Sequence, residues 1–253
     1  MAVHVLVLRA PGTNCDEETV YAFERAGAAA VRVHVARVRE NPAIVDQYQI
    51  LALPGGFTYG DDLGAGKILG NEIRFHLAEA LGRHLARGRL VLGICNGFQA
   101  LVRAGLLPGG EGSGRATLAF NDSGRFEARW VHLEVVSDRT PFFKKGARLF
   151  LPCAHGEGKF VAEDLGAIER SGQVVLRYVD REGRRGPYPV NPNGSDGDVA
   201  GICDPTGRVL GLMPHPERHV ESYHHPRWTR RPRSPEGEAD GLEVFRNAVR
   251  YFG

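Results

Sequence analysis

The sequence predicts an α/β fold with a mostly parallel central sheet flanked by helices, and an additional β region in the second half of the chain. In the first half, short aliphatic runs alternate with segments whose apolar residues recur every three or four positions. These runs are rich in Val, Leu and Ile, which is typical of parallel strands covered on both faces. Gly-containing turns follow three of them, at the strand ends where such sheets bind ligands.

The elements of the first half follow from these patterns in order. Four aliphatic runs predict strands, at Val3–Leu8, Val31–Val35, Ile50–Leu53 and Leu90–Ile94. Helices are expected at Asp16–Ala26 and Asn71–Arg87, since each segment gathers its apolar residues on one helical face. The chain has 253 residues, of which 42% are hydrophobic, and this suits a single domain spanning residues 1–253.

The second half contains further strand-like runs separated by polar turns rich in Gly and Pro. These runs are Phe126–Val136, Ala147–Leu151, Val174–Val179 and Val209–Met213. We expect them to form an antiparallel or mixed β region that completes the domain. Residues 221–239 carry several prolines and many charges, which predicts a surface loop. A last helix is expected at Leu242–Phe252.

Charge and cysteine usage argue against several classes of protein. The net charge is +2, from 32 basic and 30 acidic side chains, and this balance does not suit a nucleic-acid-binding protein. The basic stretch Arg227–Arg233 is interpreted as a solvated loop rather than an anion site. The N-terminus lacks signal-peptide features, and no apolar run approaches the ~20 residues that span a membrane. The spacing of the four cysteines fits neither a disulfide scaffold nor a zinc ribbon, so reduced thiols in the cytoplasm are expected.

The stretch from Gly93 to Gln99 has the features of a nucleophile elbow. A strand leads into a turn with glycines two residues before and two after Cys95, and a helical segment follows. Such a turn presents Cys95 at a helix N-terminus, where partial positive charge favours the thiolate. The backbone N–H of Asn96 would then bind an oxyanion. A buried and inert cysteine is the alternative interpretation.

A reactive cysteine needs an imidazole, and His215 is the first candidate among ten histidines. Prolines on both sides of His215 keep the chain extended, so His215 and Glu217 project to the same side. The carboxylate would orient the imidazole and complete a triad with Cys95. His155 is the alternative base because it too has a glutamate two residues later. The glycines around His155 suggest a flexible loop that contacts a ligand or partner instead.

Three weaker patterns complete the set of candidate motifs. The turn Pro54–Phe57 would supply a second oxyanion donor through Gly56, with a plain tight turn as the alternative. Gly64–Ile68 resembles a phosphate loop, but it lacks the earlier glycine and the Ser or Thr, so no ATP site is expected in this chain. No metal site is expected either, because the spacing of three late histidines suits no metal pair: His219, His224 and His225.

Several separate stretches together resemble one family, the glutaminase subunits of phosphoribosylformylglycinamidine synthase, which are class I glutamine amidotransferases of purine biosynthesis. The elbow Gly93–Gln99 and the segment Pro214–Glu217 resemble the triad motifs of class I amidotransferases in general. Five further motifs are more selective: Pro11–Asp16, Gly55–Asp62, Ser123–Glu127, Ala154–Phe160 and Asn191–Ser195. Residues 226–238 match no family motif.

The resemblance implies a flavodoxin-like fold and a reaction at the carboxamide of L-glutamine. Cys95 would attack that carbon, form a glutamyl thioester and release ammonia. His215 would protonate the leaving amine and then activate water, with Glu217 orienting the imidazole. The resemblance also implies roles for four further residues: Gly55 and Gln99 in glutamine binding, and Gly56 and Asn96 in the oxyanion hole.

The resemblance further implies partner subunits. Ammonia would pass to a separate ATP-dependent synthetase subunit, which is where ATP and Mg²⁺ are expected, and a small accessory subunit would complete the assembly. Two other functions are weighed against this one. The first alternative is another cysteine hydrolase or a glyoxalase-like enzyme on a related fold. The second alternative is a catalytically idle scaffold subunit. Gln99 and the late His-x-Glu favour glutamine over the first, and the intact triad counts against the second.

Overall fold

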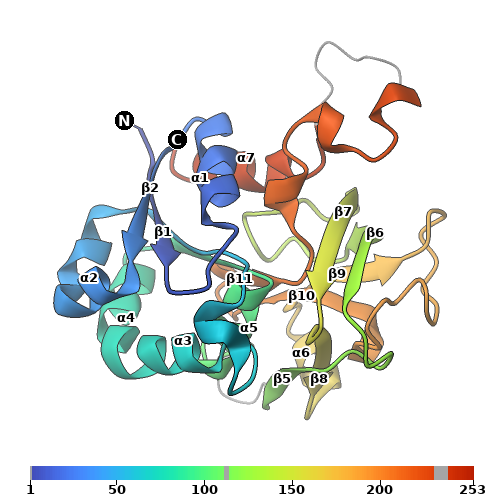
Figure 1. Cartoon of the computed structure of the whole chain (residues 1–253), viewed down its shortest axis with the longest axis horizontal. Coiled ribbons are helices and arrows are strands. Elements are labelled where there is room, and N and C mark those ends of the chain that lie inside the picture. Colours follow the sequence, from blue (N-terminus) through green and yellow to red (C-terminus); the bar gives the residue numbers. More distant parts are fainter. Residues whose placement is uncertain (1, 111–113, 231–238) are drawn as a thin grey trace.

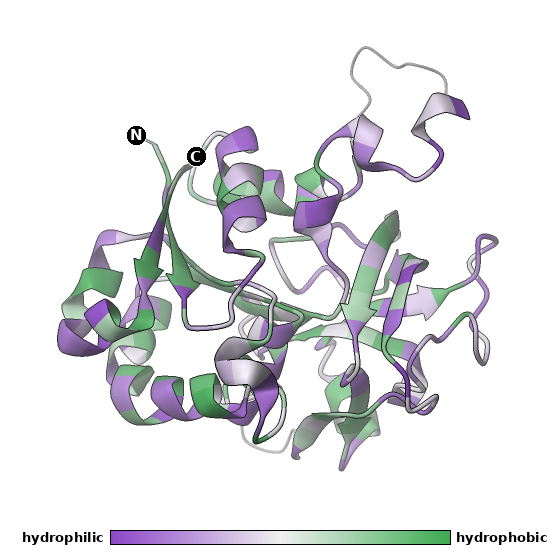
Figure 2. Cartoon of the chain, viewed as in Figure 1, coloured by the Kyte–Doolittle hydropathy of each residue, from purple (hydrophilic) through white to green (hydrophobic). Residues whose placement is uncertain are grey.

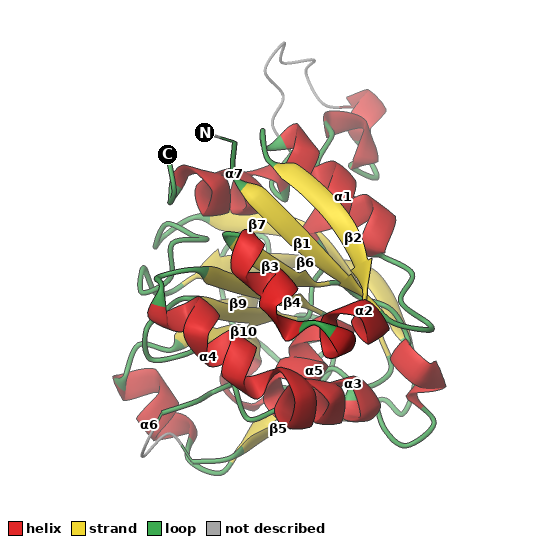
Figure 3. Ribbon diagram, turned by 90° about the vertical axis from the view of Figure 1, so that its left-hand side faces the viewer, coloured by secondary structure: helices red, strands yellow, loops and turns green. Residues whose placement is uncertain are grey.

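The computed structural model describes residues 2–110, 114–230 and 239–253. Its centre is a nine-stranded sheet with the order β2-β1-β3-β4-β11-β10-β9-β6-β7. Helices cover both faces, with α1 and α7 on one side and α3, α4 and α5 on the other (Figures 1 and 3). The predicted α/β architecture with an additional β region is therefore confirmed. Within the described ranges, none of the helices is long and apolar enough to cross a membrane.

The first five strands in this order are parallel to one another. They are β2 (Ala29–His34), β1 (His4–Arg9), β3 (Ile50–Leu53), β4 (Leu90–Ile94) and β11 (Val209–Leu212). All residues of β3, β4 and β11 are buried, as expected for strands that helices cover on both faces. The strand β11 was predicted with the second-half β region, but it pairs in parallel with β4 at the centre of the sheet.

The other half of the sheet is antiparallel. It contains β10 (Val199–Cys203), β9 (Val174–Val179), β6 (Glu127–Val135) and β7 (Arg148–His155). A separate antiparallel pair is formed by β5 (Ala116–Ala119) and β8 (Lys159–Ala162). The strands β5, β8 and β10 were not predicted. Each contains at most two Val, Leu or Ile residues, whereas the equally short β3 and β4 contain three and four, so these segments lack a clear strand signal.

The α-helices include two short ones that were not predicted, at residues 35–40 and 165–170, and the rest differ from the predictions mainly at their ends. They are α1 (Asp16–Arg25), α2 (Val35–Glu40), α3 (Lys67–Glu72), α4 (Ala78–Ala86), α5 (Asn96–Arg103), α6 (Leu165–Arg170) and α7 (Leu242–Arg250). A π-helical turn at Ile73–Leu77 joins α3 to α4. The predicted helix Asn71–Arg87 therefore corresponds to this continuous unit, which begins four residues earlier, at Lys67. The second strand ends sooner than predicted because Nδ1 of His34 accepts a hydrogen bond from the N–H of Ala36 at 3.2 Å and caps α2.

The remaining helical segments are short 3₁₀ turns. They lie at Pro42–Gln47, Thr58–Asp61, Asp196–Asp198, Pro216–Arg218, Ser222–His224 and Trp228–Arg230. The last two belong to the predicted surface loop, whose residues 231–238 lie outside the described residues. In that loop the buried side chain of His225 packs against Trp130 and Phe150, with ring centroids 5.8 and 5.4 Å apart. The loop is therefore attached to the sheet and not fully solvated.

Hydropathy follows these layers. The strands of the central sheet are largely hydrophobic, whereas the helices carry hydrophilic residues on their outward sides (Figure 2). One cluster of buried apolar residues extends from β1 through the central strands to α7. The carboxyl ends of β3, β4 and β11 consequently lie on a rigid, close-packed base, which is where the candidate site is found.

Candidate active site

Cys95 occupies a strained turn between β4 and α5. Its backbone has φ 50° and ψ −105°, a conformation that side chains other than Gly rarely adopt. The two flanking glycines allow the turn to pack. A Cβ on Gly93 would lie 2.5 Å from Cδ1 of Leu101, and one on Gly97 would collide with the carbonyl oxygen of Leu53. The structure therefore contains the nucleophile elbow that the sequence predicts.

The thiol of Cys95 is almost enclosed. The residue is 5% exposed, and its Sγ lies 3.6 Å from the carbonyl oxygen of Ala154 at the end of β7. Cys95 immediately precedes α5, so its side chain is near the partial positive charge of a helix N-terminus. This environment combines limited access to water with the positive end of a helix dipole.

His215 and Glu217 form a buried pair in the segment that follows β11. Nδ1 of His215 and Oε1 of Glu217 are 2.6 Å apart, and both side chains are almost fully buried. The backbone N–H of His215 donates to the carbonyl oxygen of Pro152 in β7 at 2.8 Å, which fixes the segment against the antiparallel half of the sheet. Nε2 of His215 is buried and has no hydrogen-bond partner among the described residues.

Burial and charge act in opposite directions on this imidazole. Burial lowers the pKa of His215, but the carboxylate of Glu217 and the thiol of Cys95 outweigh it, so the pKa lies well above its usual value. The protonated form of His215 is therefore stabilised, with the carboxylate of Glu217 at Nδ1 and Cys95 near the ring. A protonated imidazole beside a cysteine is suited to donate a proton to a leaving group.

Two residues behind His215 were not predicted to belong to the site. Cys15 is fully buried, and Nη2 of Arg218 donates to its Sγ at 2.9 Å. Ligand atoms of Cys15, His215 and Glu217 all lie within 4.8 Å of one another, the spacing of a possible cation site. The guanidinium of Arg218 against the sulfur opposes a second cation there. Cys15 lies within a family motif and Arg218 adjoins Glu217, but no pattern in the sequence joins the two residues.

The two adjacent glycines after β3 have different surroundings. A Cβ on Gly55 would lie 2.7 Å from Cε1 of His215, so this glycine makes room for the imidazole and does not line the cavity described below. Gly56 does line that cavity, with φ 149° and a backbone that pairs with Thr13. The backbone N–H of Asn96 begins α5 and so lacks an intrahelical acceptor. Gly56 and Asn96 therefore both lie close to Cys95, and their predicted part in an oxyanion hole stays a prediction.

A cavity of about 160 Å³ opens beside Cys95. Its lining residues are Gly56, Phe57, Asp61, Ala65, Cys95, Gln99, Phe120, Phe126, Ala154, His155, Gly156 and Glu157. None of these described lining residues is a lysine or an arginine, whereas two are carboxylates. Burial is the main cause that raises the pKa of Asp61 above its usual value. Both carboxylates accept hydrogen bonds within the protein, Asp61 from Gly66 and Asn96, and Glu157 from Ala65.

The side chain of Gln99 is already engaged within the protein. Its Oε1 accepts from Nδ2 of Asn96 at 2.9 Å, and its Nε2 donates to the carbonyl oxygen of Glu157 at 2.5 Å. The amide of Asn96 is held in turn by Thr58, whose Oγ1 donates to Oδ1 at 2.5 Å. Gln99 thus ties the elbow to the cavity wall at residue 157. Its predicted contact with glutamine stays a prediction.

His155 differs from the expected flexible loop residue. It is the last residue of β7, it is 2% exposed, and it pairs with Glu127 of β6. Its Nδ1 faces Oδ1 of Asn121 at 3.0 Å and not a carboxylate. The carboxylate of Glu157 instead accepts from the N–H of Ala65 at 3.3 Å. A role of His155 as the base would require a carboxylate at Nδ1, and Asn121 occupies that place among the described residues.

The turn at Gly64–Ile68 and the late histidine His219 both make packing contacts within the fold. At Gly64–Ile68, a Cβ on Gly66 would lie 2.6 Å from the backbone nitrogen of Ala100, so this glycine allows α3 to pack on α5. His219 packs on Trp130, with ring centroids 5.0 Å apart, while its Nδ1 lies 2.9 Å from the carbonyl oxygen of Phe150.

Comparisons with known proteins agree along the whole chain. The family model of the CobB/CobQ-like glutamine amidotransferase domain matches residues 2–252. Phosphoribosylformylglycinamidine synthase subunit PurQ of Dehalococcoides mccartyi is 50% identical, over 98% of this chain and 97% of that protein. The protein of the same name in Methanococcus maripaludis is 40% identical, over 98% and 97%. The structure of PurLQS from Thermotoga maritima matches with a TM-score of 0.77 and 36% identity, covering 100% of both chains. The chain belongs to the CobB/CobQ-like glutamine amidotransferase family.

Proposed function

We propose that this chain is the glutaminase subunit of phosphoribosylformylglycinamidine synthase and that it releases ammonia from L-glutamine through a thioester on Cys95. One observation carries the chemistry. A cysteine in a nucleophile elbow adjoins a buried imidazole whose other nitrogen is held by a carboxylate at 2.6 Å. This is the arrangement of nucleophile, base and orienting group that acyl transfer requires.

The proposed first half-reaction makes the thioester. The Cys95 thiolate attacks the carboxamide carbon of glutamine, and the oxygen of that group becomes an oxyanion. The backbone N–H groups of Asn96 and Gly56 stabilise this charge. Nε2 of protonated His215 gives its proton to the nitrogen as the carbon–nitrogen bond breaks, which releases ammonia and leaves neutral imidazole.

The proposed second half-reaction regenerates the enzyme. Neutral His215 takes a proton from water while the water oxygen attacks the thioester carbon. The carbon–sulfur bond then breaks, glutamate leaves, and the thiolate and imidazolium are restored. Glu217 holds Nδ1 of His215 throughout and stabilises the imidazolium whenever it forms.

The subunit's partners are part of the proposal. The curated relatives are each called a subunit of phosphoribosylformylglycinamidine synthase, and the structural neighbour is called PurLQS, which supports a multi-subunit assembly. We place ATP and Mg²⁺ on a synthetase subunit that receives the ammonia, and we expect a small accessory subunit beside it. The amidine of the product would be formed on the synthetase and not in this chain.

Labelling with a glutamine-mimicking electrophile tests the proposed nucleophile. Diazo-oxo-norleucine should modify Cys95 alone, and glutamine should protect it, as measured by peptide mapping. The matched controls are Cys15 and Cys153, two buried thiols near the triad. Labelling of either control with Cys95 untouched would contradict the mechanism. Labelling of Cys95 without protection by glutamine would favour another cysteine hydrolase.

A further inference from the structure

One buried imidazole in the cavity wall has no part in the proposed triad. His155 is 2% exposed and lines the cavity together with Cys95. Its Nε2 is buried and has no hydrogen-bond partner among the described residues. A buried polar atom without a partner is costly, and most such atoms in folded proteins are satisfied. An unsatisfied nitrogen beside a nucleophile therefore points to a group that the substrate supplies.

The protons on this imidazole are fixed by Asn121. Nδ2 of Asn121 donates to the carbonyl oxygens of Arg125 and His155, both at 2.8 Å, so its Oδ1 must be the acceptor end of the amide. Oδ1 accepts from the N–H of Gly158 at 3.1 Å and faces Nδ1 of His155 at 3.0 Å. Nδ1 consequently carries the hydrogen, and Nε2 carries a lone pair.

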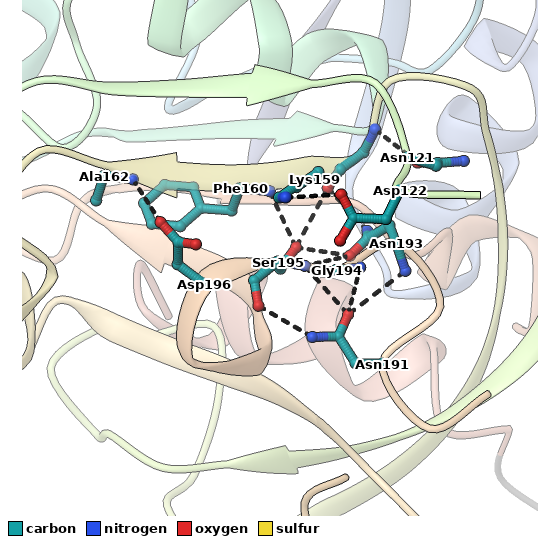
Figure 4. Close-up of polar contacts among 11 residues, drawn as sticks. Asn121, Asp122, Lys159, Phe160, Ala162, Asn191, Asn193, Gly194, Ser195 and Asp196 are labelled. Carbon is teal, nitrogen blue, oxygen red and sulfur yellow. Dashed lines mark hydrogen bonds and ion pairs between the residues drawn. The ribbon is translucent and has the colours of Figure 1, made fainter. Parts of the chain in front are cut away.

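A second network holds this part of the cavity wall in place. Nδ2 of Asn193 donates to the carbonyl oxygen of Gly158 at 2.8 Å, and the backbone N–H of Asp122 donates to the carbonyl oxygen of Asn193 at 3.1 Å. Oγ of Ser195 accepts from the N–H of Phe160 at 2.9 Å (Figure 4). The motif Asn191–Ser195 thus supports the strand that follows His155.

The surroundings of His155 keep its imidazole neutral, so its Nε2 remains a hydrogen-bond acceptor. Burial, aided by the nearby His215, lowers the pKa of His155 to about 4, so the imidazole is neutral at physiological pH. The other polar side chains of the wall include the carboxylates of Asp61 and Glu157. Both carboxylates already accept hydrogen bonds within the protein, so Nε2 of His155 is the acceptor of the described wall that lacks a donor.

We propose that Nε2 of His155 accepts a hydrogen bond from an N–H group of the bound substrate and so makes the site selective for a nitrogen-bearing acyl compound. This inference rests on the proposed glutaminase function. Glutamine carries two such groups, the α-ammonium and the carboxamide. His155 is then a substrate-binding residue, while the base remains His215.

The variant His155→Phe tests the inference, because it keeps a ring in the cavity wall and removes the acceptor. In the complex with the synthetase subunit, the KM for glutamine should rise about tenfold or more, with a smaller change in kcat. The variant His155→Gln restores an acceptor in the cavity wall through its side-chain Oε1, so it should recover part of the loss. The matched control is His84→Phe, which alters a fully buried histidine on α4 outside the cavity and should leave the KM unchanged.

Two glutamine analogues identify the donor. Glutaramic acid lacks the α-ammonium, and the γ-methyl ester of glutamate lacks the carboxamide N–H. The penalty of His155→Phe, measured as the change in kcat/KM or in the inhibition constant, should disappear for the analogue without the group that Nε2 contacts. An equal penalty for glutamine and both analogues would indicate a structural role and overturn the inference.

The remaining outcomes separate this inference from the proposed function. If the unaltered complex does not consume glutamine, the proposed function fails. If it does and His155→Phe leaves the KM for glutamine unchanged, only the role of His155 fails. Ammonia-dependent synthesis by the same complexes shows that each variant is folded and assembled, so a loss of folding is not mistaken for a loss of binding.

Discussion

The two histidines of the site are distinguished by the group that each Nδ1 faces. A carboxylate lies 2.6 Å from Nδ1 of His215, whereas a side-chain amide lies 3.0 Å from Nδ1 of His155. The carboxylate stabilises an imidazolium, and the amide oxygen only selects a tautomer of the neutral ring. The imidazole of His215 is therefore prepared to hold a proton, whereas that of His155, in the wall of the cavity, is prepared to accept a hydrogen bond.

The variant Glu217→Gln should expose this effect in a pH profile. The Glu217 carboxylate raises the pKa of His215, so its removal lowers that pKa, and the active protonated form is lost at lower pH. The basic limb of kcat/KM for glutamine should move to lower pH by about one unit or more, and the rate should fall by about 10²- to 10⁴-fold. A basic limb that stays in place would show that Glu217 does not act on His215.

Single-residue patterns predicted some of this site and not the rest. Cys95, His215 and Glu217 stand out because the glycine spacing and the two prolines constrain the backbone locally. The contact between Cys15 and Arg218 joins residues 203 positions apart, and no local rule of spacing connects them. The same holds for Asn121 and His155, which β-strand pairing and a turn bring together.

The elbow between β4 and α5 is the element on which the site depends. Its strand is fully buried, and the first turn of its helix approaches the carbonyl oxygen of Leu53 so closely that no Cβ fits at Gly97. The strained φ of Cys95 persists because packing on both sides determines the backbone. A small change in this packing should therefore alter both stability and catalysis.

The variant Gly97→Ala tests that dependence against a matched control. Its Cβ would meet the backbone of Leu53, so we expect a loss of about 2 kcal/mol or more in the free energy of unfolding. Gly82→Ala also lies in a helix, but its Cβ meets nothing within 4 Å, and it should be neutral or stabilising by up to about 1 kcal/mol. Equal effects of the two variants in urea titrations would contradict the packing account.

Among the elements, aliphatic content and helix length decided what the sequence could predict. The strands at Ile50–Leu53, Leu90–Ile94 and Val174–Val179 were predicted at their observed bounds, because each is rich in Val, Leu and Ile and lies between turn residues. The six-residue helix α6 carries too few turns to show a helical period. The early start of α3 depends on Gly66, whose close contact with α5 is a tertiary effect.

Across the whole molecule, the two halves of the sheet converge on one site. The parallel half contributes Cys95 through β4 and His215 through β11, and the antiparallel half contributes residues 154 and 155 through β7. The hydrogen bond from the N–H of His215 to Pro152 and the approach of Cys95 Sγ to Ala154 join them. The composition of the second half predicted more strands, but strand order is set by pairings between distant segments, which periodicity does not encode.

In the proposed mechanism, Cys95 serves only to supply ammonia. The variant Cys95→Ala, in the complex with the synthetase subunit, tests this role. We expect glutamine-dependent formation of the amidine product to be abolished, while synthesis from added ammonium salt continues at the rate of the unaltered complex. The matched variant Cys203→Ala, which alters a buried thiol on β10, should retain both activities. Loss of both activities in Cys95→Ala, or survival of the glutamine-dependent one, would contradict the account.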